Sequence, residues 1–416
     1  MKTTDWRTVP LWSVATETRV AVDPSDLGDQ VVHYSIPAVD ATGTGQVEAT
    51  DSIKSAKLRL QGGEVLVSKL NPRKSRVLIV TESPLPIVSS TEFVGLLPGA
   101  KLEPRFLAYF LQSEATRQAL DSQVQSVTRS HQRVAPEDVT HLPIRLPSLD
   151  EQHRIAQFLD AETARIDKLI RLQGLVVERL DERERAQLDS ALDELINRWG
   201  SVPLRRFLRG VDQGTSPQAD AVPAGADEWG VLKVSCLRPG RFFPNENKRL
   251  PPSLEPEINH EVRPGDLLIT RANTPQLVGS TAVVPPIRGK LLLSDKIFRV
   301  RIDKRITTEF VATVARGTRI RDLCAASSNG ASQSMANIRF EEVKAWPLPA
   351  APLDAQHDLV RSVNRQRSVL DDLRTKVERQ SRLLTERRQA LITAAVTGHF
   401  DVTTASGRNV IEGVTA

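Results

Sequence analysis

The chain has 416 residues, of which 40% are hydrophobic and 26% are charged, as expected for a folded protein of two or three domains. The first residues, 1–6, lack an apolar core and no stretch is long and apolar enough to span a membrane, so we expect neither a signal peptide nor a membrane anchor. The two cysteines, Cys236 and Cys324, are too few for a disulfide scaffold or a zinc cluster and favour a cytoplasmic protein. The net charge of +5 permits nucleic acid as a partner.

The first part of the chain predicts a mixed α/β region. Residues 8–12 are typical of a short strand, residues 62–70 of a turn that feeds a strand, and residues 77–80 of a returning strand. Residues 104–120 have the periodicity of an amphipathic helix. Residues 142–147 then predict an extended segment that leads into a much longer helix.

The long helix is predicted over residues 149–196. Its apolar residues recur in steps of three, four and seven, which is the spacing of a coiled-coil seam. Ser148 and Glu151 fit a capping box, in which each side chain accepts a hydrogen bond from the other residue's backbone. The helix is expected to end near Gly200, because Pro203 cannot continue it.

The whole arrangement occurs twice. Residues 149–153 return as residues 353–357, and the matching glutamines lie 356 − 152 = 204 residues apart. The second half repeats the first strand at residues 201–205 and the turn and strand at 264–271, and its helix is predicted to end at Gly398. The sequence therefore predicts an α+β fold with an internal two-fold pseudo-repeat: two mixed α/β domains and two long helices.

The residues expected in the helix seam are apolar and follow the heptad spacing. They are Ile166, Leu169, Val176 and Leu180 in the first helix, and Leu370, Leu373, Val377 and Leu384 in the second.

Motifs for nucleotide and base chemistry are incomplete. Residues 225–230 have the glycine spacing of a P-loop, but Val231 stands where the phosphate-binding lysine is needed. Asn71-Pro72 starts like the motif of amino-methyltransferases but lacks the aromatic residue that stacks on a flipped base. Neither motif predicts catalysis.

Two further patterns contain residue types that metal sites use. Glu342 and Lys344 are residue types found in metal-dependent nucleases, where an acid holds the cation and a lysine assists the attacking water. Their counterpart in the first half, Asp138-Val139-Thr140, has no lysine. His153 and His357 match across the repeat, but each lacks a second ligand at metal spacing, so packing at the helix start is the favoured role. We predict no metal and no catalytic residue.

Several motifs in combination resemble the specificity subunit of type I restriction–modification enzymes. They are the Pro-x-Leu-x-Glu-Gln-x-x-Ile-Ala start in residues 147–156, residues 158–160, 166–170, 68–73, 89–93 and 265–268, and Leu-Ile-Thr-Ala-Ala-Val-Thr-Gly at 391–398. The likeness covers nearly the whole chain. It departs at Ala355, which stands where the first copy has Glu151 and weakens the cap of the second helix.

The resemblance implies target recognition domains at residues 1–147 and 200–352. Spacer helices at 148–199 and 353–398 would form an antiparallel coiled coil, and residues 399–416 a C-terminal tail. Each domain would read one half of a split site in double-stranded DNA, and the helices would set the gap between the halves.

The resemblance also implies partners, while this chain itself would be non-catalytic. Two modification subunits would methylate adenine with S-adenosylmethionine, and a restriction subunit would use ATP and Mg²⁺. The cofactors would belong to these partners.

Side chains in polar and basic loops are the candidates for DNA contacts, since Arg and Lys bind phosphates and Arg, Lys, Asn and Gln read base edges. In the first domain they are Lys69, Asn71, Arg73, Lys74, Arg76, Arg129, His131, Gln132 and Arg133. In the second they are Arg271, Asn273, Thr274, Gln276, Asn329, Ser332, Gln333, Ser334 and Asn337.

Three other functions fit parts of the sequence. A coiled-coil scaffold that binds proteins but not DNA is the main alternative. A nuclease built on Glu342 and Lys344 and a stand-alone DNA-binding regulator are the others.

Overall fold

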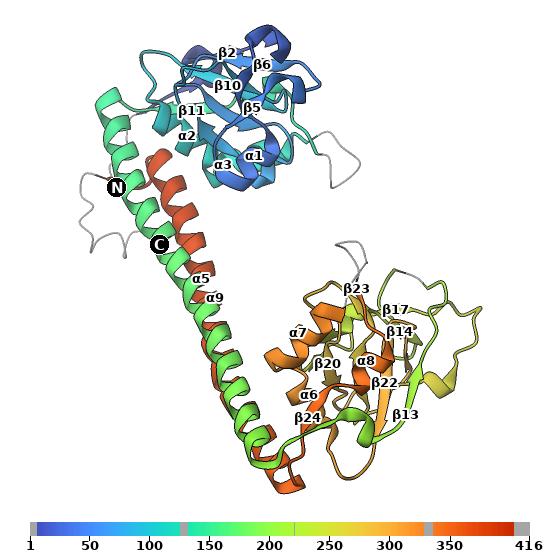
Figure 1. The fold of residues 1–416 in the computed structure, drawn as a ribbon. Coiled ribbons are helices and arrows are strands. Elements are labelled where there is room, and N and C mark those ends of the chain that lie inside the picture. The colour runs from blue at the N-terminus through green and yellow to red at the C-terminus, as the bar shows by residue number, and fades with distance from the viewer. Residues whose placement is uncertain (1–5, 125–131, 220, 328–335, 403–416) are drawn as a thin grey trace. The chain divides into compact units, whose positions relative to one another are not determined.

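The computed structural model describes residues 6–124, 132–219, 221–327 and 336–402 (Figure 1). The chain forms two compact units. Unit 1 is Met1–Gly174 with Glu378–Ala416, and unit 2 is Leu175–Val377. Each unit therefore contains one mixed region together with one half of each long helix.

The helices α1 to α4 belong to unit 1, α6 to α8 belong to unit 2, and α5 and α9 are the two long helices. Their bounds are α1 Ile36–Thr42, α2 Pro104–Gln112, α3 Glu114–Ser122, α4 Pro136–Thr140, α5 Leu149–Trp199, α6 Thr308–Val314, α7 Thr318–Ser327, α8 Phe340–Lys344 and α9 Leu353–Val396.

The strands of unit 1 lie in three sheets. Their bounds are β1 Arg7–Pro10, β2 Ala15–Thr18, β3 Ala21–Val22, β4 Gln30–Tyr34, β5 Gln46–Ala49, β6 Lys57–Leu60, β7 Val65–Ser68, β8 Val77–Ile79, β9 Ile87–Ser89, β10 Phe93–Pro98 and β11 Pro143–Leu146. The sheet β2-β10-β7-β8 is antiparallel throughout, and the sheet β3-β6-β9-β4-β5 contains one parallel pair, β4 with β9. The third sheet pairs β1 with β11, so the segment that enters the unit lies beside the segment that leaves it for α5.

Unit 2 repeats this plan. Its strands are β12 Ser201–Pro203, β13 Leu208–Gln213, β14 Gly230–Leu232, β15 Leu237–Arg238, β16 Arg241–Phe242, β17 Asn247–Arg249, β18 Leu267–Thr270, β19 Ala272–Asn273, β20 Thr281–Val283, β21 Leu291–Leu292, β22 Ile297–Ile302, β23 Ala336–Asn337 and β24 Pro347–Pro349. The antiparallel sheet β13-β22-β18-β20 has the order of β2-β10-β7-β8, and β12 pairs β24 as β1 pairs β11. The smaller sheets β17-β14-β21, β15-β16 and β19-β23 complete the unit.

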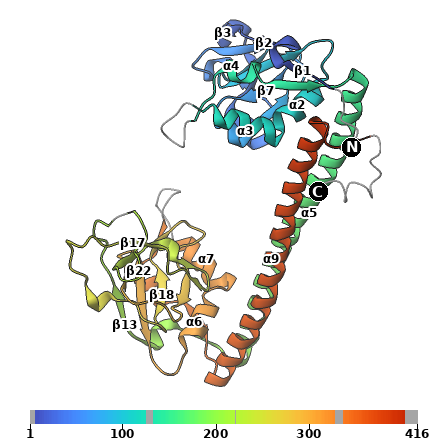
Figure 2. The ribbon, with the colours of Figure 1, turned by 180° about the vertical axis from the view of Figure 1, so that it is seen from behind.

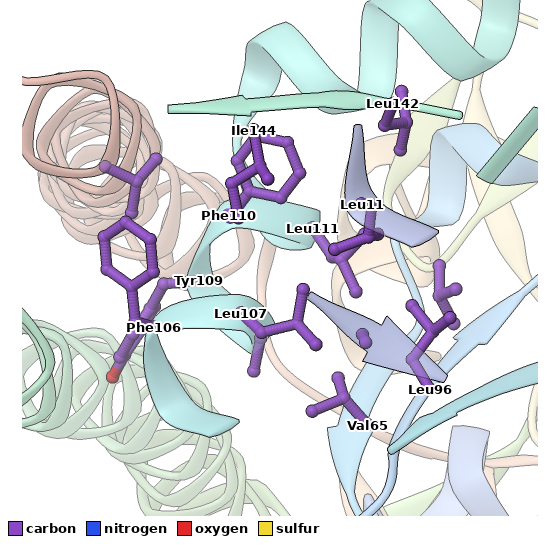
Figure 3. Close-up of a cluster of buried hydrophobic side chains, with 14 of the residues drawn as sticks. Leu11, Val65, Leu96, Phe106, Leu107, Tyr109, Phe110, Leu111, Leu142 and Ile144 are labelled. Atoms are coloured by element: carbon purple, nitrogen blue, oxygen red, sulfur yellow. The ribbon is translucent and has the colours of Figure 1, made fainter. Parts of the chain in front are cut away.

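The main hydrophobic core of each unit joins a sheet to both long helices. In unit 1, side chains of α2 such as Phe106 and Leu107 belong to one buried cluster with Leu11, Leu96 and Ile144 (Figure 3). The same core includes residues from the start of α5 and the end of α9, among them Ile155, Leu159, Leu391, Ile392 and Ala395. In unit 2 the helix residues are Leu188 and Leu192 from the end of α5, and Leu359 and Val363 from the start of α9. The main core of each mixed region is therefore complete only when both long helices pack against it.

Within each unit α5 and α9 run side by side in opposite directions, seen from behind in Figure 2. In unit 1, Asp167 pairs with Arg388 and Gln173 with Ser381, so the partner's number falls as the α5 number rises. In unit 2 Arg374 binds both Asp181 and Glu184. The predicted antiparallel helix pair is confirmed.

The eight residues predicted for the seam differ in burial. Ile166 and Leu370 are buried, and Leu180, Val377 and Leu384 are half-buried. Leu169, Val176 and Leu373 are 43, 47 and 41% exposed, so their prediction is wrong.

At each of these three positions, the residue that follows in the sequence is less exposed than the predicted seam residue. Ile170, Val177 and Arg374 are half-buried there. Hydrophobicity alone favours a leucine over an arginine, but the carboxylates facing position 374 satisfy the charge of Arg374.

Two local predictions also need correction. The helix expected over residues 104–120 breaks at Ser113, whose hydroxyl accepts a hydrogen bond from Thr116 N at 3.3 Å and begins α3. The capping box at the start of α5 is only half formed: Glu151 N donates to Ser148 Oγ at 3.3 Å. The Glu151 carboxylate instead accepts from the indole of Trp6 at 3.2 Å.

Candidate DNA interface and helix pair

The two predicted DNA loops of unit 1 lie against each other. Asn71 N donates to Gln132 O at 2.8 Å, and Val134 N donates to Lys69 O at 3.2 Å. A β-bridge joins Leu70 to Arg133. The fold thus brings together two basic segments that are about 60 residues apart in the sequence. One follows the end of β7, and the other precedes the start of α4.

A short helical turn presents the basic side chains of the first loop. Asn71 and Ser75 have φ of 51° and 47°, in the left-handed region, and flank the turn Pro72–Lys74. Asn adopts this conformation more readily than most residues, which explains why it stands here. Arg73 and Lys74 are exposed as a result.

Arg73 and Arg133 are accessible but already partnered. Arg73 donates to the side-chain oxygen of Gln132 and lies 3.3 Å from Asp121. Arg133 makes two hydrogen bonds to the Glu92 carboxylate, at 3.0 and 2.9 Å, and this pairing raises the pKa of Arg133. The side chains of both arginines are about half exposed, 51 and 52%, so a phosphate can reach either guanidinium.

Arg76, a candidate for DNA contact by sequence, has a buried and paired side chain in the structure. Its side chain is 7% exposed and binds Asp40 with two hydrogen bonds, at 2.5 and 2.8 Å. The pairing holds the pKa of Asp40 below its usual value. Arg76 also donates to Leu70 O at 3.2 Å, which secures the base of the loop. Its role is to shape the loop, and Asp40 gave no sequence signal because it lies 36 residues away.

Unit 2 has the same crossing. Ala272 and Asn273 of β19 pair with Asn337 and Ala336 of β23. Gln276 and Asn337 are exposed, and Arg271 and Thr274 are half-buried. Asn273 is only 8% exposed, and its side-chain oxygen accepts from Thr274 N at 2.9 Å, so this oxygen supports the loop.

Six predicted DNA residues lie outside the described parts of the chain. They are Arg129, His131, Asn329, Ser332, Gln333 and Ser334. Gln132 is described and half-buried beside Arg73.

The chain is similar in sequence to known proteins. Residues 28–173 match the family described as type I restriction modification DNA specificity domain. The specificity subunit of the Escherichia coli type I restriction enzyme EcoEI is 29% identical over 200 residues, covering 48% of this chain and 34% of the relative. The match thus spans about a third of that relative's length. The EcoKI specificity subunit of Escherichia coli strain K12 is 23% identical over 403 residues, covering 89% of this chain and 85% of the relative. Over most of its length the chain is thus similar to specificity subunits of type I restriction enzymes, and residues 28–173 match their DNA specificity domain.

A solved structure agrees with this assignment at the level of the fold. A chain from a study of complex assembly and conformational transition of the type I R-M system superposes with a TM-score of 0.72 at 20% identity, covering 95% of this chain and 98% of that one. The fold of this chain, with its mixed regions and long helices, is therefore one that a solved structure already shows.

Glu342 and Lys344, the two residues of the nuclease alternative, both have structural partners in this chain. The Glu342 carboxylate accepts from Arg339 N at 2.7 Å and begins α8, just as Asp138 accepts from Ala135 N at 2.7 Å to begin α4. Lys344 pairs with Glu341 at 2.5 Å. The Glu-x-Lys pattern is therefore a helix cap followed by a surface ion pair.

The matching histidines also have local surroundings that explain them. His153 Nδ1 lies 3.1 Å from Glu103, while His357 is exposed. Among the described residues, no group of three His, Cys, Asp or Glu side chains is placed to hold a metal ion. Within the same residues, no helix combines the length and apolarity needed to cross a membrane.

The helix pair carries polar groups in its interior that the sequence analysis did not single out. Ser381 Oγ lies 2.5 Å from Gln173 Oε1 in unit 1, and Arg374 binds Glu184 at 2.7 Å in unit 2. The available signal was their spacing, since Gln173, Glu184 and Arg374 fall on the heptad steps. Polar groups inside a coiled coil fix its register, because a shifted pair would leave them buried without partners.

Proposed function

We propose that this specificity subunit reads a bipartite site in double-stranded DNA, each unit contacting one half. The observation that carries the proposal is the repeated crossing. In both units a polar loop after a buried strand, β7 or β18, bridges to the segment before a short helix, α4 or α8. Arg73, Lys74 and Arg133 supply positive charge in unit 1, and Gln276 and Asn337 supply amides in unit 2. Such groups bind phosphates and base edges.

The exposed apolar residues on the outer surface of the helix pair are evidence for a docking surface for partner subunits. Leu169, Leu172, Leu175 and Val176 on α5, and Val369, Leu373 and Leu383 on α9, are between 41 and 58% exposed. Large apolar side chains exposed in series along a helix favour an interface with another protein. We assign this surface to two modification subunits.

Catalysis in the proposed complex belongs to the partners. The modification subunits would bind S-adenosylmethionine and methylate adenine in each half-site. A restriction subunit would bind ATP and Mg²⁺. The specificity subunit would supply recognition by residues 1–147 and 200–352, with the helices 148–199 and 353–398 setting the gap.

The test is a map of methyl-adenine in DNA from cells that co-express this chain with a modification subunit encoded beside it. The expected result is a split motif with an unspecified gap. Replacing residues 1–147 by the corresponding region of another family member should change one half of the motif, and replacing residues 200–352 should change the other half. A soluble complex that leaves no motif would favour the scaffold alternative.

A further inference from the structure

A cavity of about 660 Å³ lies entirely within unit 2, between the helix pair and the loops around Arg238 and Arg316. Seven of its lining side chains are arginines and three are carboxylates. Nothing in the sequence pattern singled it out, because its residues come from five separate segments.

Two of the arginines form ion pairs with carboxylates of α5 and α9. Arg316 is 8% exposed and binds the Glu184 carboxylate, which also accepts from Arg374 at 2.7 Å. Arg374 binds Asp181 at 2.5 Å and Asp371 at 2.9 Å as well. The carboxylates at this end of the cavity are thus occupied by Arg316 and Arg374.

Arg367 is held mainly by backbone. It donates to Gly240 O at 3.0 Å and Pro239 O at 3.3 Å, and its Nε lies 4.0 Å from the nearest oxygens of Glu184 and Asp371. Burial, together with the positive charges of Arg316 and Arg241, lowers the pKa of Arg367 to about 10. Its guanidinium stays charged at neutral pH in a region of positive potential.

Gly240 allows this close approach. It has φ of 69°, and a Cβ atom there would lie 2.7 Å from both Arg316 Cδ and Arg367 Nη1. The loop therefore closes on the arginines only with glycine at this position.

Arg321 also has unused donor capacity. Its Nη2 donates to Gln276 O at 2.7 Å, while its Nη1 is buried and has no hydrogen-bond partner among the described residues. Burial lowers the pKa of Arg321. Arg185, on the exposed face of α5, lies at the edge of the same cavity.

The fold does not require this charge. The offset of 204 residues holds through the structure: Gln152 accepts from Glu103 N, and Gln356 accepts from Thr307 N. At this offset the counterparts of Arg316, Arg367 and Arg374 in unit 1 are Gln112, Thr163 and Ile170. The same scaffold is built there from neutral residues, so the fold of a unit does not depend on arginine at these three positions. In unit 2 Arg374 also pairs with acids across the helix pair, whereas Arg316 and Arg367 add positive charge to the cavity.

We propose that the arginine cavity of unit 2 binds phosphate groups. Guanidinium groups match phosphate oxygens in geometry, and here they exceed the carboxylates and include an unpartnered buried donor. The phosphate comes from one of two sources. It is a free polyphosphate, or it is the DNA backbone, since Gln276 belongs both to the cavity and to the candidate DNA loop. The second source rests on the proposed function.

The first experiment titrates the full chain with sodium pyrophosphate in a calorimeter. The test variant is Arg185→Gln with Arg321→Gln, two arginines whose removal leaves the ion pairs around Glu184 intact. The control variant is Arg183→Gln with Arg319→Gln, each two positions earlier, exposed and outside the cavity lining. If free polyphosphate is the ligand, the parent chain and the control bind one equivalent, and the test variant binds at least about tenfold more weakly.

The second experiment measures binding of a DNA duplex carrying the methylated motif across a salt series, using the complex with modification subunits. If the DNA backbone is the ligand, the slope of log affinity against log salt falls by about one for each of the two arginines that contacts a phosphate. The control variant keeps the parent slope. A retained methylation motif in the test variant separates this loss from loss of sequence reading.

The two experiments together distinguish the two sources of phosphate. Weaker pyrophosphate binding with an unchanged DNA slope identifies a free-polyphosphate site, and a reduced slope identifies a DNA backbone site. If pyrophosphate does not bind and the slope is unchanged, the phosphate site is refuted while the split methylation motif still supports the proposed function. Saturable pyrophosphate binding without any motif would overturn the proposed function alone.

Discussion

Gln152 and Gln356 hold the start of a long helix to its own unit. The Gln152 side chain accepts from Glu103 N at 2.8 Å and donates to Lys101 O at 3.0 Å and Pro147 O at 3.1 Å. Gln356 makes the matching bonds to Thr307 N, Arg305 O and Ala351 O. Both glutamines are at most 1% exposed. The strongest motif of the repeat is therefore a buried backbone clamp.

Replacing Gln152 by Ala removes this clamp in unit 1. The backbone groups of residues 101, 103 and 147 lose their partner in a buried place, and we expect the free energy of unfolding of unit 1 to fall by about 2–3 kcal/mol. Urea unfolding followed by circular dichroism measures the change. Gln157→Ala, on the exposed face of the same helix, is the control and should change stability by less than about 0.5 kcal/mol. Equal effects would contradict the clamp.

Arg73→Ala tests the candidate DNA loop of unit 1. If Arg73 contacts one phosphate, the variant should bind DNA more weakly at every sequence and lower the salt slope by about one. Binding of a duplex at several salt concentrations measures this. Arg59→Ala, an exposed arginine on β6 outside the loop, should keep the parent slope. An unchanged slope for Arg73→Ala would remove this residue from the interface.

Tyr109 predicts how stability changes at alkaline pH. Burial raises the pKa of Tyr109 to about 12, and its hydroxyl donates to Asp160 at 2.8 Å. The unfolded chain loses this proton near its ordinary pKa of about 10, so unfolding is favoured as pH rises from about 10 to 12 and is unaffected below. Urea midpoints at pH 9 and pH 11 should differ more for the parent chain than for Tyr109→Phe. Parallel shifts in both proteins would show that Tyr109 does not titrate in this way.

At the scale of elements, the two long helices meet through a seam that mixes leucines with ion pairs. Leu370 is 7% exposed in the seam, whereas Leu373, three residues later, is 41% exposed on the outer surface. The inner place beside Leu373 belongs to Arg374, which binds Glu184 and Asp181. The seam therefore depends on charge pairing as well as on apolar burial.

The pair Leu370→Asp and Leu373→Asp separates the two faces of α9. A carboxylate at position 370 removes the buried apolar contacts of the leucine and places a charge in the seam, and it should lower the free energy of unfolding by about 3 kcal/mol or more. The same change at position 373 should leave the melting temperature within a few degrees of the parent, but weaken assembly with the modification subunits. Thermal unfolding and co-purification provide the two readouts. A large loss of stability from Leu373→Asp alone would contradict this assignment of faces.

At the scale of the molecule, neither unit is a continuous stretch of chain. Unit 1 takes the first half of α5 and the second half of α9, and unit 2 takes the remaining halves. Each core contains residues from both helices. A change in helix length therefore acts on the connection between the two recognition regions while leaving each core intact.

Inserting one heptad into each long helix, after Gly174 and after Val377, tests the proposed spacer. Seven residues lengthen a helix by about 10 Å and preserve the seam register, whereas one base pair rises about 3.4 Å. The methylation motif should keep both half-sites and gain a gap longer by up to about three base pairs. A heptad inserted into α5 alone is the control and should abolish methylation, because the seam no longer matches. An unchanged gap in the double insertion would refute the spacer role.

The sequence by itself determined the repeat, the two long helices, the main strands and the family, because these follow from local periodicity and from motifs repeated at a constant offset. It also indicated which loops carry basic and polar side chains. Only the tertiary structure decided that Ser113 divides a predicted helix, that Arg76 binds Asp40, and that Arg374 rather than Leu373 faces the seam. These outcomes depend on groups far apart in the chain. The same reason hid the arginine cavity, whose residues meet only when the helix pair and the loops of unit 2 are packed together.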